Sequence, residues 1–531
     1  MQTDCTHIPY QLTGYFSKIV TDYLEEHPDI LPFYAHSVSL EGIANAIKAR
    51  QSFIQDRNLL VSELHQQYNG IEQQAEVQDN INALSQSNTF TVTTAHQPNI
   101  FTGPVYFIYK ILHAIKLAVR LSQQFTSYKF VPVYYMGSED ADLKELGSIT
   151  INSQKYTWQT KQTGAVGRMK VDKNFIALMQ QLHGQVGVEK YGEELIALFR
   201  WCYREGATIQ QATLELVNAL FGKYGLVVLI PDNPNLKRSF GPVIKKELIE
   251  GFSYPAVKET ITELEKKYKA QAGGRELNLF YLIDNKRERI EKEGDTWKVK
   301  SLKIEWSEED VVKELDDHPE RFSPNVILRG VFQETILPNI AFIGGGGELA
   351  YWLELKKVFE AVSVPYPVLI LRNSFLLIEE RWYKKMQGLA FREEDLFKPE
   401  QTLMDIVVAR NSGNRFELNG ELSSIENAYD EIKALAGKID TTLKAHVEAL
   451  RTKTVNRLLQ LEKKLKSAEK KKFETERLQI QKLKEALFPN NNLQERIENV
   501  AGFYAKHGSN VLQKLLDNSL TLEQQFTVLE V

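Results

Sequence analysis

Short β-prone runs that each end in a polar turn are the feature that most constrains the fold of this 531-residue chain. The runs are 90–94, 130–136, 226–230, 339–343 and 367–371. Near-continuous apolar runs of this length are typical of strands that are covered on both faces. A helical pattern from Tyr106 to about Ser122 separates the first two runs, which gives the strand–helix–strand order of a parallel unit. The sequence therefore predicts an α/β protein built on a doubly wound parallel sheet.

The segments between these runs predict how the rest of the chain is organised. Residues 1–88 are polar with apolar residues at helical spacing, so we expect mostly helices there. Two long inserts, about 150–220 and 250–325, are expected to form subdomains around the sheet. The second contains 279–283 and Trp297, which indicate a small antiparallel piece. We expect a core over 1–385, a helical coiled-coil domain over 386–495, and a C-terminal helix over 496–531 that returns to the core.

A long helical segment covers about 422–488, where the chain is rich in Lys, Glu and Gln and lacks Pro. Apolar residues such as Leu443, Val447 and Leu450 recur there at steps of three and four. This spacing predicts helices with a narrow apolar stripe, and a stripe that narrow needs a partner helix. The partner is either a second helix of the same chain or a second subunit, and we expect a homodimer.

Composition and charge restrict the function classes. A net charge of -4 and a pI near 6.3 argue against a globally basic surface for nucleic acid. The two cysteines, Cys5 and Cys202, suit a reducing compartment, and Cys202 is more typical of a buried thiol than of a nucleophile. Neither a signal peptide at the start nor a run of about 18 apolar residues is present. We therefore expect a cytoplasmic protein that binds neither membrane nor nucleic acid.

The turn after the first predicted strand is the first candidate site. His96 and Gln97 follow that strand, and 102–104 lead into the next helix, which carries Lys110. Ligands of open α/β sheets bind beyond the carboxyl ends of strands, where the amides at helix N-termini attract anions. The alternative is an ordinary strand–helix turn with a helix cap.

Acidic and glycine-rich turns follow two other strands. Glu139, Asp140 and Asp142 crowd three carboxylates together and would bind an amine, sugar hydroxyls or Mg²⁺, unless they only cap a helix. Four glycines, 344–347, precede Glu348 and are expected to form an anion-binding nest that opens a helix over 349–362, unless they form a flexible turn. Arg372 follows the last predicted strand and could bind a carboxylate or phosphate through two hydrogen bonds. The alternative, a surface arginine beside an Asn-Ser turn, fits the pattern equally well.

These motifs together resemble a known family. Three stretches resemble motifs of the bacillithiol biosynthesis cysteine-adding enzymes (BshC): residues 95–104 with Tyr106–Lys110, residues 133–142 with Glu145, and residues 322–329 with 333–334, 337–338 and 344–352. The resemblance covers nearly the whole chain. This sequence has His96 where the family has Gln, Pro98-Asn99 in place of a small pair, and Ala141 where His is common.

The resemblance implies a Rossmann-like core related to class I nucleotidyltransferases and synthetases, two connecting-peptide inserts and a dimerising coiled coil. It implies a ligase that joins L-cysteine to glucosaminyl-malate by an amide bond. The cofactor stays open, with ATP or ADP and Mg²⁺ as candidates. The alternatives are a synthetase-like enzyme that activates another carboxylic acid and a non-catalytic coiled-coil scaffold.

From the motifs we predict four catalytic residues, no metal-ligand set, and a larger group of substrate-binding residues. The predicted catalytic residues are His96, Glu139, Asp140 and Asp142. The predicted substrate-binding residues are Gln97, Asn99, Thr102, Gly103, Tyr106, Lys110, Gly345, Gly346, Gly347, Glu348, Tyr351, Arg372, Asn373 and Ser374.

Overall fold

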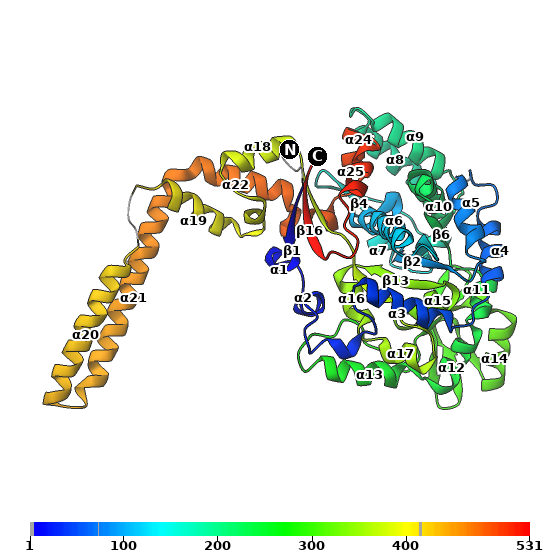
Figure 1. Cartoon of the computed structure of the whole chain (residues 1–531), viewed down its shortest axis with the longest axis horizontal. Coiled ribbons are helices and arrows are strands. Elements are labelled where there is room, and N and C mark those ends of the chain that lie inside the picture. The colour runs from blue at the N-terminus through cyan, green and yellow to red at the C-terminus, as the bar shows by residue number, and fades with distance from the viewer. Residues whose placement is uncertain (1–4, 73, 414–416) are drawn as a thin grey trace. The chain divides into compact units, whose positions relative to one another are not determined.

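The computed structural model describes residues 5–72, 74–413 and 417–531. The chain folds into two compact units (Figure 1). The first unit holds the residues up to 377 together with 492–529 and 531. The second holds 378–491 and 530.

A five-stranded parallel sheet forms the centre of the first unit. Its strands are β2 (Thr89–His96), β3 (Lys129–Met136), β6 (Val227–Leu229), β13 (Asn339–Gly344) and β14 (Val368–Leu371). The order across the sheet is β14-β13-β2-β3-β6, and every neighbouring pair is parallel. The predicted strands and the doubly wound, Rossmann-like fold are confirmed. The strand order reverses between β2 and β13, which is where ligands of such sheets bind.

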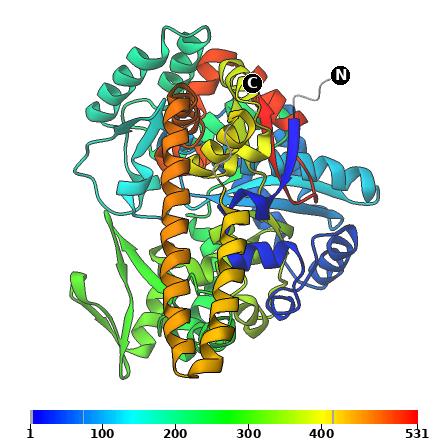
Figure 2. The same ribbon diagram turned by 90° about the vertical axis from the view of Figure 1, so that its left-hand side faces the viewer.

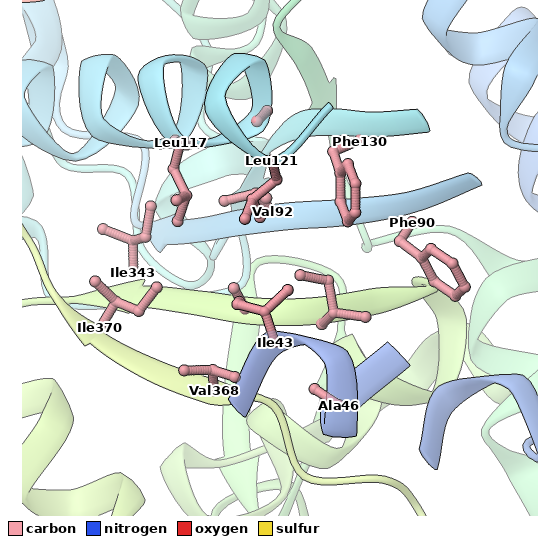
Figure 3. Packing of buried hydrophobic residues seen from close by; sticks show 14 of the residues in the cluster. Ile43, Ala46, Phe90, Val92, Leu117, Leu121, Phe130, Ile343, Val368 and Ile370 are labelled. Atoms are coloured by element: carbon pink, nitrogen blue, oxygen red, sulfur yellow. The ribbon is translucent and has the colours of Figure 1, made fainter. Parts of the chain in front are cut away.

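Helices cover the sheet and bury its apolar side chains. α6 (Tyr106–Gln124) packs on β2 and β3, while α3 (Leu40–Gln51) packs on β13 and β14. Figure 3 shows Leu117 and Leu121 of α6 beside Val92, and Ile43 of α3 nearby. Each large apolar side chain removed from water in this way contributes about 1.5–3 kcal/mol. The helices and strands that alternate along the sequence therefore pack together around one continuous hydrophobic core.

The N-terminal region and the first insert are largely helical. The N-terminal helices are α1 (Tyr10–Thr13), α2 (Lys18–Leu24), α3, α4 (Arg57–Gln67) and α5 (Ala75–Ala83). The insert contains α7 (Leu143–Leu146), the hairpin β4 (Ser148–Ile151) and β5 (Gln154–Thr157), and the helices α8 (Lys173–Val186), α9 (Gly192–Cys202) and α10 (Ile209–Phe221).

The second insert contains the antiparallel pieces that the sequence predicts. One sheet has the order β12-β7-β8 and another has the order β11-β10-β9. The strands are β7 (Leu279–Ile283), β8 (Lys286–Arg289), β9 (Glu291–Glu293), β10 (Thr296–Val299), β11 (Ile304–Trp306) and β12 (Phe322–Pro324). The helices around them are α11 (Pro234–Ser239), α12 (Gly241–Glu250), α13 (Ser253–Leu264) and α14 (Glu308–Asp317).

The segment after the glycine run differs from the single helix expected over 349–362. It forms two helices, α16 (Gly346–Trp352) and α17 (Lys356–Ala361), after α15 (Val326–Ile336) and β13. Trp352 stacks on Phe342 of β13 with ring centroids 4.3 Å apart. The buried Leu353 and Leu355 lie at the break, so core packing there outweighs helix continuity.

The C-terminal segment lies against the start of the chain. It contains α23 (Gln494–Ile497), α24 (Ala501–His507), α25 (Asn510–Asp517) and β16 (Gln525–Glu530). Strand β16 lies between β1 (Cys5–Pro9) and β15 (Phe375–Ile378) in a three-stranded sheet. Neither β1 nor β16 was expected from the sequence, where the tail was expected to be helical.

The second unit consists of helices α18 (Glu380–Gly388), α19 (Glu400–Asn411), α20 (Asn419–Ile439), α21 (Leu443–Lys470) and α22 (Glu474–Leu487). α20 and α21 lie side by side as a helical hairpin (Figures 1 and 2). Lys433 pairs with Glu448 at 2.5 Å across the hairpin, and the Tyr429 and Thr454 hydroxyls are 2.9 Å apart. Helix α21 thus has a mate within the chain, although Leu443 and Leu450 of its apolar stripe remain exposed. The expected range 386–495 includes 414–416, which lie outside the described residues.

No helix in the described ranges is long and apolar enough to cross a membrane.

Candidate active site

A cavity of about 340 Å³ opens at the carboxyl edge of the parallel sheet, between the ends of β2 and β13. The reversal of strand order leaves a crevice there, because the connections from the two strands run to opposite sides of the sheet. The cavity is lined by Ala95, His96, Gln97, Tyr106, Lys110, Tyr135, Gly137, Asp140, Val326, Arg329, Gly345, Gly346, Gly347, Glu348, Tyr351, Arg372 and Arg496.

His96 is the last residue of β2, and its buried, neutral imidazole forms part of the cavity wall. Its ring stacks on Phe107 at 5.0 Å and meets the edge of Tyr106 at 5.4 Å. Burial, together with the charges of Lys110 and Arg372, holds the pKa of His96 well below its ordinary value. Its Nε2 is buried without a hydrogen-bond partner among the described residues. A ligand in the cavity can provide that partner.

Asp140 follows β3 and is the carboxylate of the acidic run that reaches the cavity. Gln97 Nε2 donates to its Oδ2 at 3.3 Å, and Arg329 Nη2 lies 3.8 Å from the same oxygen. Burial would raise the pKa of Asp140, but Arg329 and hydrogen bonds from the Asp142 amide and Gln97 outweigh burial and lower it. The carboxylate is therefore ionised and has room for a positively charged or hydrogen-bonding partner.

The other two members of the acidic run point elsewhere. Glu139 forms a buried ion pair with Lys237 of α11 and accepts a hydrogen bond from Ser323 Oγ at 3.1 Å. Asp142 is the N-cap of α7, where its Oδ1 accepts from the Glu145 amide at 3.2 Å. Successive residues of a turn face different directions, so the three carboxylates do not gather at one point.

Lys110 and Glu348, which both line the cavity, form an ion pair. Lys110 Nζ also donates to the Ala95 carbonyl at 2.9 Å, and Glu348 accepts from the Gly345 amide at 2.8 Å. Burial lowers the pKa of Lys110, although Glu348 opposes the shift. The pair ties α6 to the first turn of α16.

The glycine run lines the cavity but does not form the expected nest. None of residues 344–347 has a positive φ, so the alternating backbone of a nest is absent there. Gly344 ends β13, Gly345 caps α16, and the next two begin the helix. A Cβ at Gly344 would lie 2.8 Å from the Phe342 ring. Gly344 is therefore needed for close packing, whereas a Cβ at Gly345 or Gly346 would make only ordinary contacts and one at Gly347 would meet open space.

Arg372 is held by a partner that the sequence did not indicate. Its Nη2 pairs with Glu495 at 2.7 Å, and its Nη1 donates to Ser374 Oγ at 3.0 Å. Its Nε is buried without a partner in the described part of the chain. Its guanidinium lies over the Tyr106 ring, 5.0 Å from the centroid. Burial, and to a lesser degree Glu348, raises the pKa of Tyr106 to about 12, which keeps the phenol protonated.

Several predicted residues lie behind the cavity instead of in it. Asn373 Nδ2 donates to the Leu520 carbonyl at 3.1 Å, and Ser374 Oγ donates to Glu495 at 3.2 Å. Asn99, Thr102 and Gly103 form the turn before α6, and Thr102 (φ 73°) and Gly103 (φ 63°) have left-handed backbone. These residues shape the turn and the strand end that carry the cavity wall. Tyr351 lies on the cavity, and burial raises its pKa.

The charge balance of the cavity favours an anionic ligand. Its lining has four cationic side chains, Lys110, Arg329, Arg372 and Arg496, against the two carboxylates of Asp140 and Glu348. The sequence analysis did not predict Arg329 or Arg496 as site residues, although Arg329 is the last residue of the 322–329 motif. Arg496 lies more than 120 residues from any other lining residue, so no local signal pointed to it.

No group of three or more His, Cys, Asp or Glu side chains within the described ranges is arranged to hold a metal ion.

The fold and the cavity define a Rossmann-like α/β protein with a pocket rich in cationic side chains at the switch point of its sheet. Comparison with protein families gives a more specific result. Residues 1–373 match the N-terminal Rossmann-like domain of bacillithiol biosynthesis BshC, and residues 375–531 match its C-terminal coiled-coil domain. The chain belongs to the BshC family of bacillithiol biosynthesis.

Full-length relatives agree with this assignment. Proteins of Flavobacterium johnsoniae and Flavobacterium psychrophilum are each 38% identical to this chain and cover 100% of both chains. A protein of Christiangramia forsetii is 36% identical over 100% of this chain and 99% of its own. All three carry the name "Putative cysteine ligase BshC".

Proposed function

We propose that the protein is a ligase that joins the carboxyl group of L-cysteine to the 2-amine of glucosaminyl-malate, forming the amide of bacillithiol. The observation that carries the proposal is the cationic cavity at the switch point of a chain that matches the BshC family from end to end. Glucosaminyl-malate has two carboxylates and an amine, and the cavity has an excess of cations beside one ionised, accessible carboxylate.

Asp140 is the residue that we propose for the amine. An ionised carboxylate within hydrogen-bond reach of the neutral amine orients it and takes a proton from its nitrogen as the nitrogen attacks the acyl carbon and the activating group leaves. Gln97 and Arg329 hold the Asp140 carboxylate in place. Glu139 and Asp142 serve the structure instead, through the Lys237 pair and the helix cap.

The remaining polar groups fit the acyl side of the reaction. A carboxylate is a poor electrophile, so cysteine has to be activated, for example as an acyl-adenylate or acyl-phosphate, and the activating group leaves when the amide bond forms. His96 Nε2 is a neutral group in a cationic wall that can bond to an anionic oxygen as charge develops. Lys110, whose Nζ donates to the Ala95 carbonyl, adds fixed positive charge beside it.

The test is a reconstituted reaction. Purified protein is supplied with glucosaminyl-malate, L-cysteine, ATP and Mg²⁺, and bacillithiol is measured by mass spectrometry. Asp140→Asn is expected to lower kcat by about 10²- to 10⁴-fold, while Asp295→Asn, an exposed turn residue, is a matched control. Absence of product from the wild-type protein with any nucleoside triphosphate contradicts the proposal. Amino-acid-dependent pyrophosphate exchange with another acid instead favours a synthetase for that acid.

We also propose that the protein is a homodimer that acts in the cytoplasm. More than half of the exposed large apolar side chains in the described ranges lie on α20, α21 and α22, including Ile432, Leu435 and Ile439. The hairpin leaves these side chains in water, and a second subunit would cover them. Cys5 and Cys202 are free thiols, which fits a reducing compartment.

A further inference from the structure

The segment 494–499 brings three separate parts of the first unit together at the cavity. The Glu498 carbonyl accepts from the Val105 amide at 2.7 Å, at the start of α6. Asn499 donates its backbone amide to the Thr150 carbonyl at 2.8 Å and its Nδ2 to the Phe101 carbonyl at 2.8 Å. Gln494 Nε2 donates to the Leu377 carbonyl at 3.1 Å. The segment is therefore fixed on both sides of residues 495 and 496.

Glu495 uses this fixed position to orient Arg372. The Glu495 side chain is fully buried, and its carboxylate accepts from Arg372 Nη2 at 2.7 Å, from Ser374 Oγ at 3.2 Å and from the Phe375 amide at 3.3 Å. With both Nη atoms engaged, the guanidinium cannot rotate, and its unpartnered Nε lies beside the cavity wall at Gly345.

Arg496 is the adjacent residue, and it lines the cavity with a guanidinium that is free to bind. Within the described part of the chain, its side chain makes neither an ion pair nor a hydrogen bond. Lys110, Arg329 and Arg372 each have a carboxylate within 4 Å. Among the described residues, Arg496 is thus the cation of the cavity that has no carboxylate within 4 Å.

The Tyr106 ring is near both of these arginines. It stacks under Arg372 and is close enough to Arg496 for the two to interact electrostatically. Its protonated hydroxyl is a third donor on the same wall. An arginine fork recognises a carboxylate through two parallel hydrogen bonds, and additional neutral donors extend such a site.

We propose that Arg496 is a specificity-determining residue that binds a carboxylate of the substrate, and that Glu495 is a positioning residue that aims Arg372 at the same group. The inference rests on the proposed function, since it assigns a place for one of the two malyl carboxylates of glucosaminyl-malate. It also gives the C-terminal segment a part in the site.

The test measures the affinity for glucosaminyl-malate by calorimetry over a range of salt concentrations. Arg496→Gln is expected to weaken binding by about ten- to hundredfold, because a charge-assisted hydrogen bond is lost. Its affinity should also depend less steeply on salt, because one charge no longer contributes. Arg496→Lys keeps the charge without the fork, so its affinity should fall between the two while its salt dependence stays that of the wild type. Arg120→Gln, an exposed arginine outside the cavity, is the matched control.

Two results overturn the inference while leaving the proposed function intact. One is a wild-type affinity for Arg496→Gln. The other is a weaker affinity with the wild-type salt dependence, which would mean that the substitution disturbed the pocket without removing a charge contact. Wild-type protein that does not bind glucosaminyl-malate contradicts both the proposed function and this inference.

Discussion

At the scale of single residues, the buried pair of Arg372 and Glu495 connects stability to the site. Their side chains are 3% and 0% exposed, so each charge depends on the other for compensation. Removing one partner of a buried pair leaves an uncompensated charge and costs about 3–5 kcal/mol. We expect Glu495→Gln to lower the free energy of unfolding by about this amount in a denaturant titration. Lys266→Gln breaks an exposed pair with Glu263 and should change the unfolding curve very little, so equal losses in both variants would contradict the account.

His113 of α6 predicts a pH dependence of stability. Its Nε2 lies 2.7 Å from the Thr521 carbonyl, and its Nδ1 accepts from the Asn373 amide at 3.1 Å, which fits the neutral tautomer with the proton on Nε2. Burial lowers the pKa of His113 from 6.5 to about 4. Between these two values the unfolded chain binds a proton that the folded chain does not. Stability from this residue is therefore complete above pH 6.5 and is lost as the pH falls toward 4.

The accompanying measurement is a set of unfolding titrations between pH 7 and 4. The whole effect of His113 amounts to roughly 3 kcal/mol. We expect His113→Gln to be less stable than the wild type at pH 7 and to show a flatter loss of stability on acidification. Parallel pH profiles of the two proteins would mean that His113 has the same pKa in the folded and unfolded chains, which would contradict this prediction.

At the scale of elements, the sequence predicted the helices and strands that follow from local patterns of apolar residues. The five strands and α6 follow from apolar runs and helical spacing, because burial on both faces demands them. The positions of Gln97, Lys110, Glu348 and Arg372 at the cavity follow from their place at strand ends or on α6. The sequence could not show that Glu139 turns toward Lys237, or that Glu495 and Arg496 complete the wall. Those outcomes depend on contacts between residues far apart in the chain, for which a single sequence has no periodic signal.

The turn over 99–103 provides a prediction at this scale. Phe101 and Thr102 have φ angles of 49° and 73°, which are unfavourable for residues with a Cβ. Asn499 stabilises the turn by donating Nδ2 to the carbonyls of Phe101 and Gly103. We expect Asn499→Ala to cost about 1–3 kcal/mol for each buried acceptor left unpaired, and to speed hydrogen exchange in 99–103. Asn174→Ala, which removes a surface asparagine bonded to the Gln159 carbonyl, should leave exchange in that turn unchanged.

At the scale of the whole molecule, the exposed apolar stripe of the hairpin predicts the assembly. Leu435 is 61% exposed and Ile439 is 77% exposed. We expect light scattering to give twice the 60.9 kDa of one chain for the wild type. The double variant Leu435→Glu, Ile439→Glu should scatter as a monomer, because charges would be buried in the interface. Leu12→Glu, which changes a 61% exposed leucine of α1, should remain dimeric. A monomeric wild-type protein would exclude this assembly.

The central claim is that the cavity between the ends of β2 and β13 holds the substrate. Its most direct test is a crystal structure of the protein with glucosaminyl-malate bound. The account predicts ligand density in that cavity, with the amine beside Asp140 and a carboxylate in contact with Arg496. Density for the ligand at another place, with His96, Asp140 and Arg496 unchanged and without contact to it, would contradict the claim.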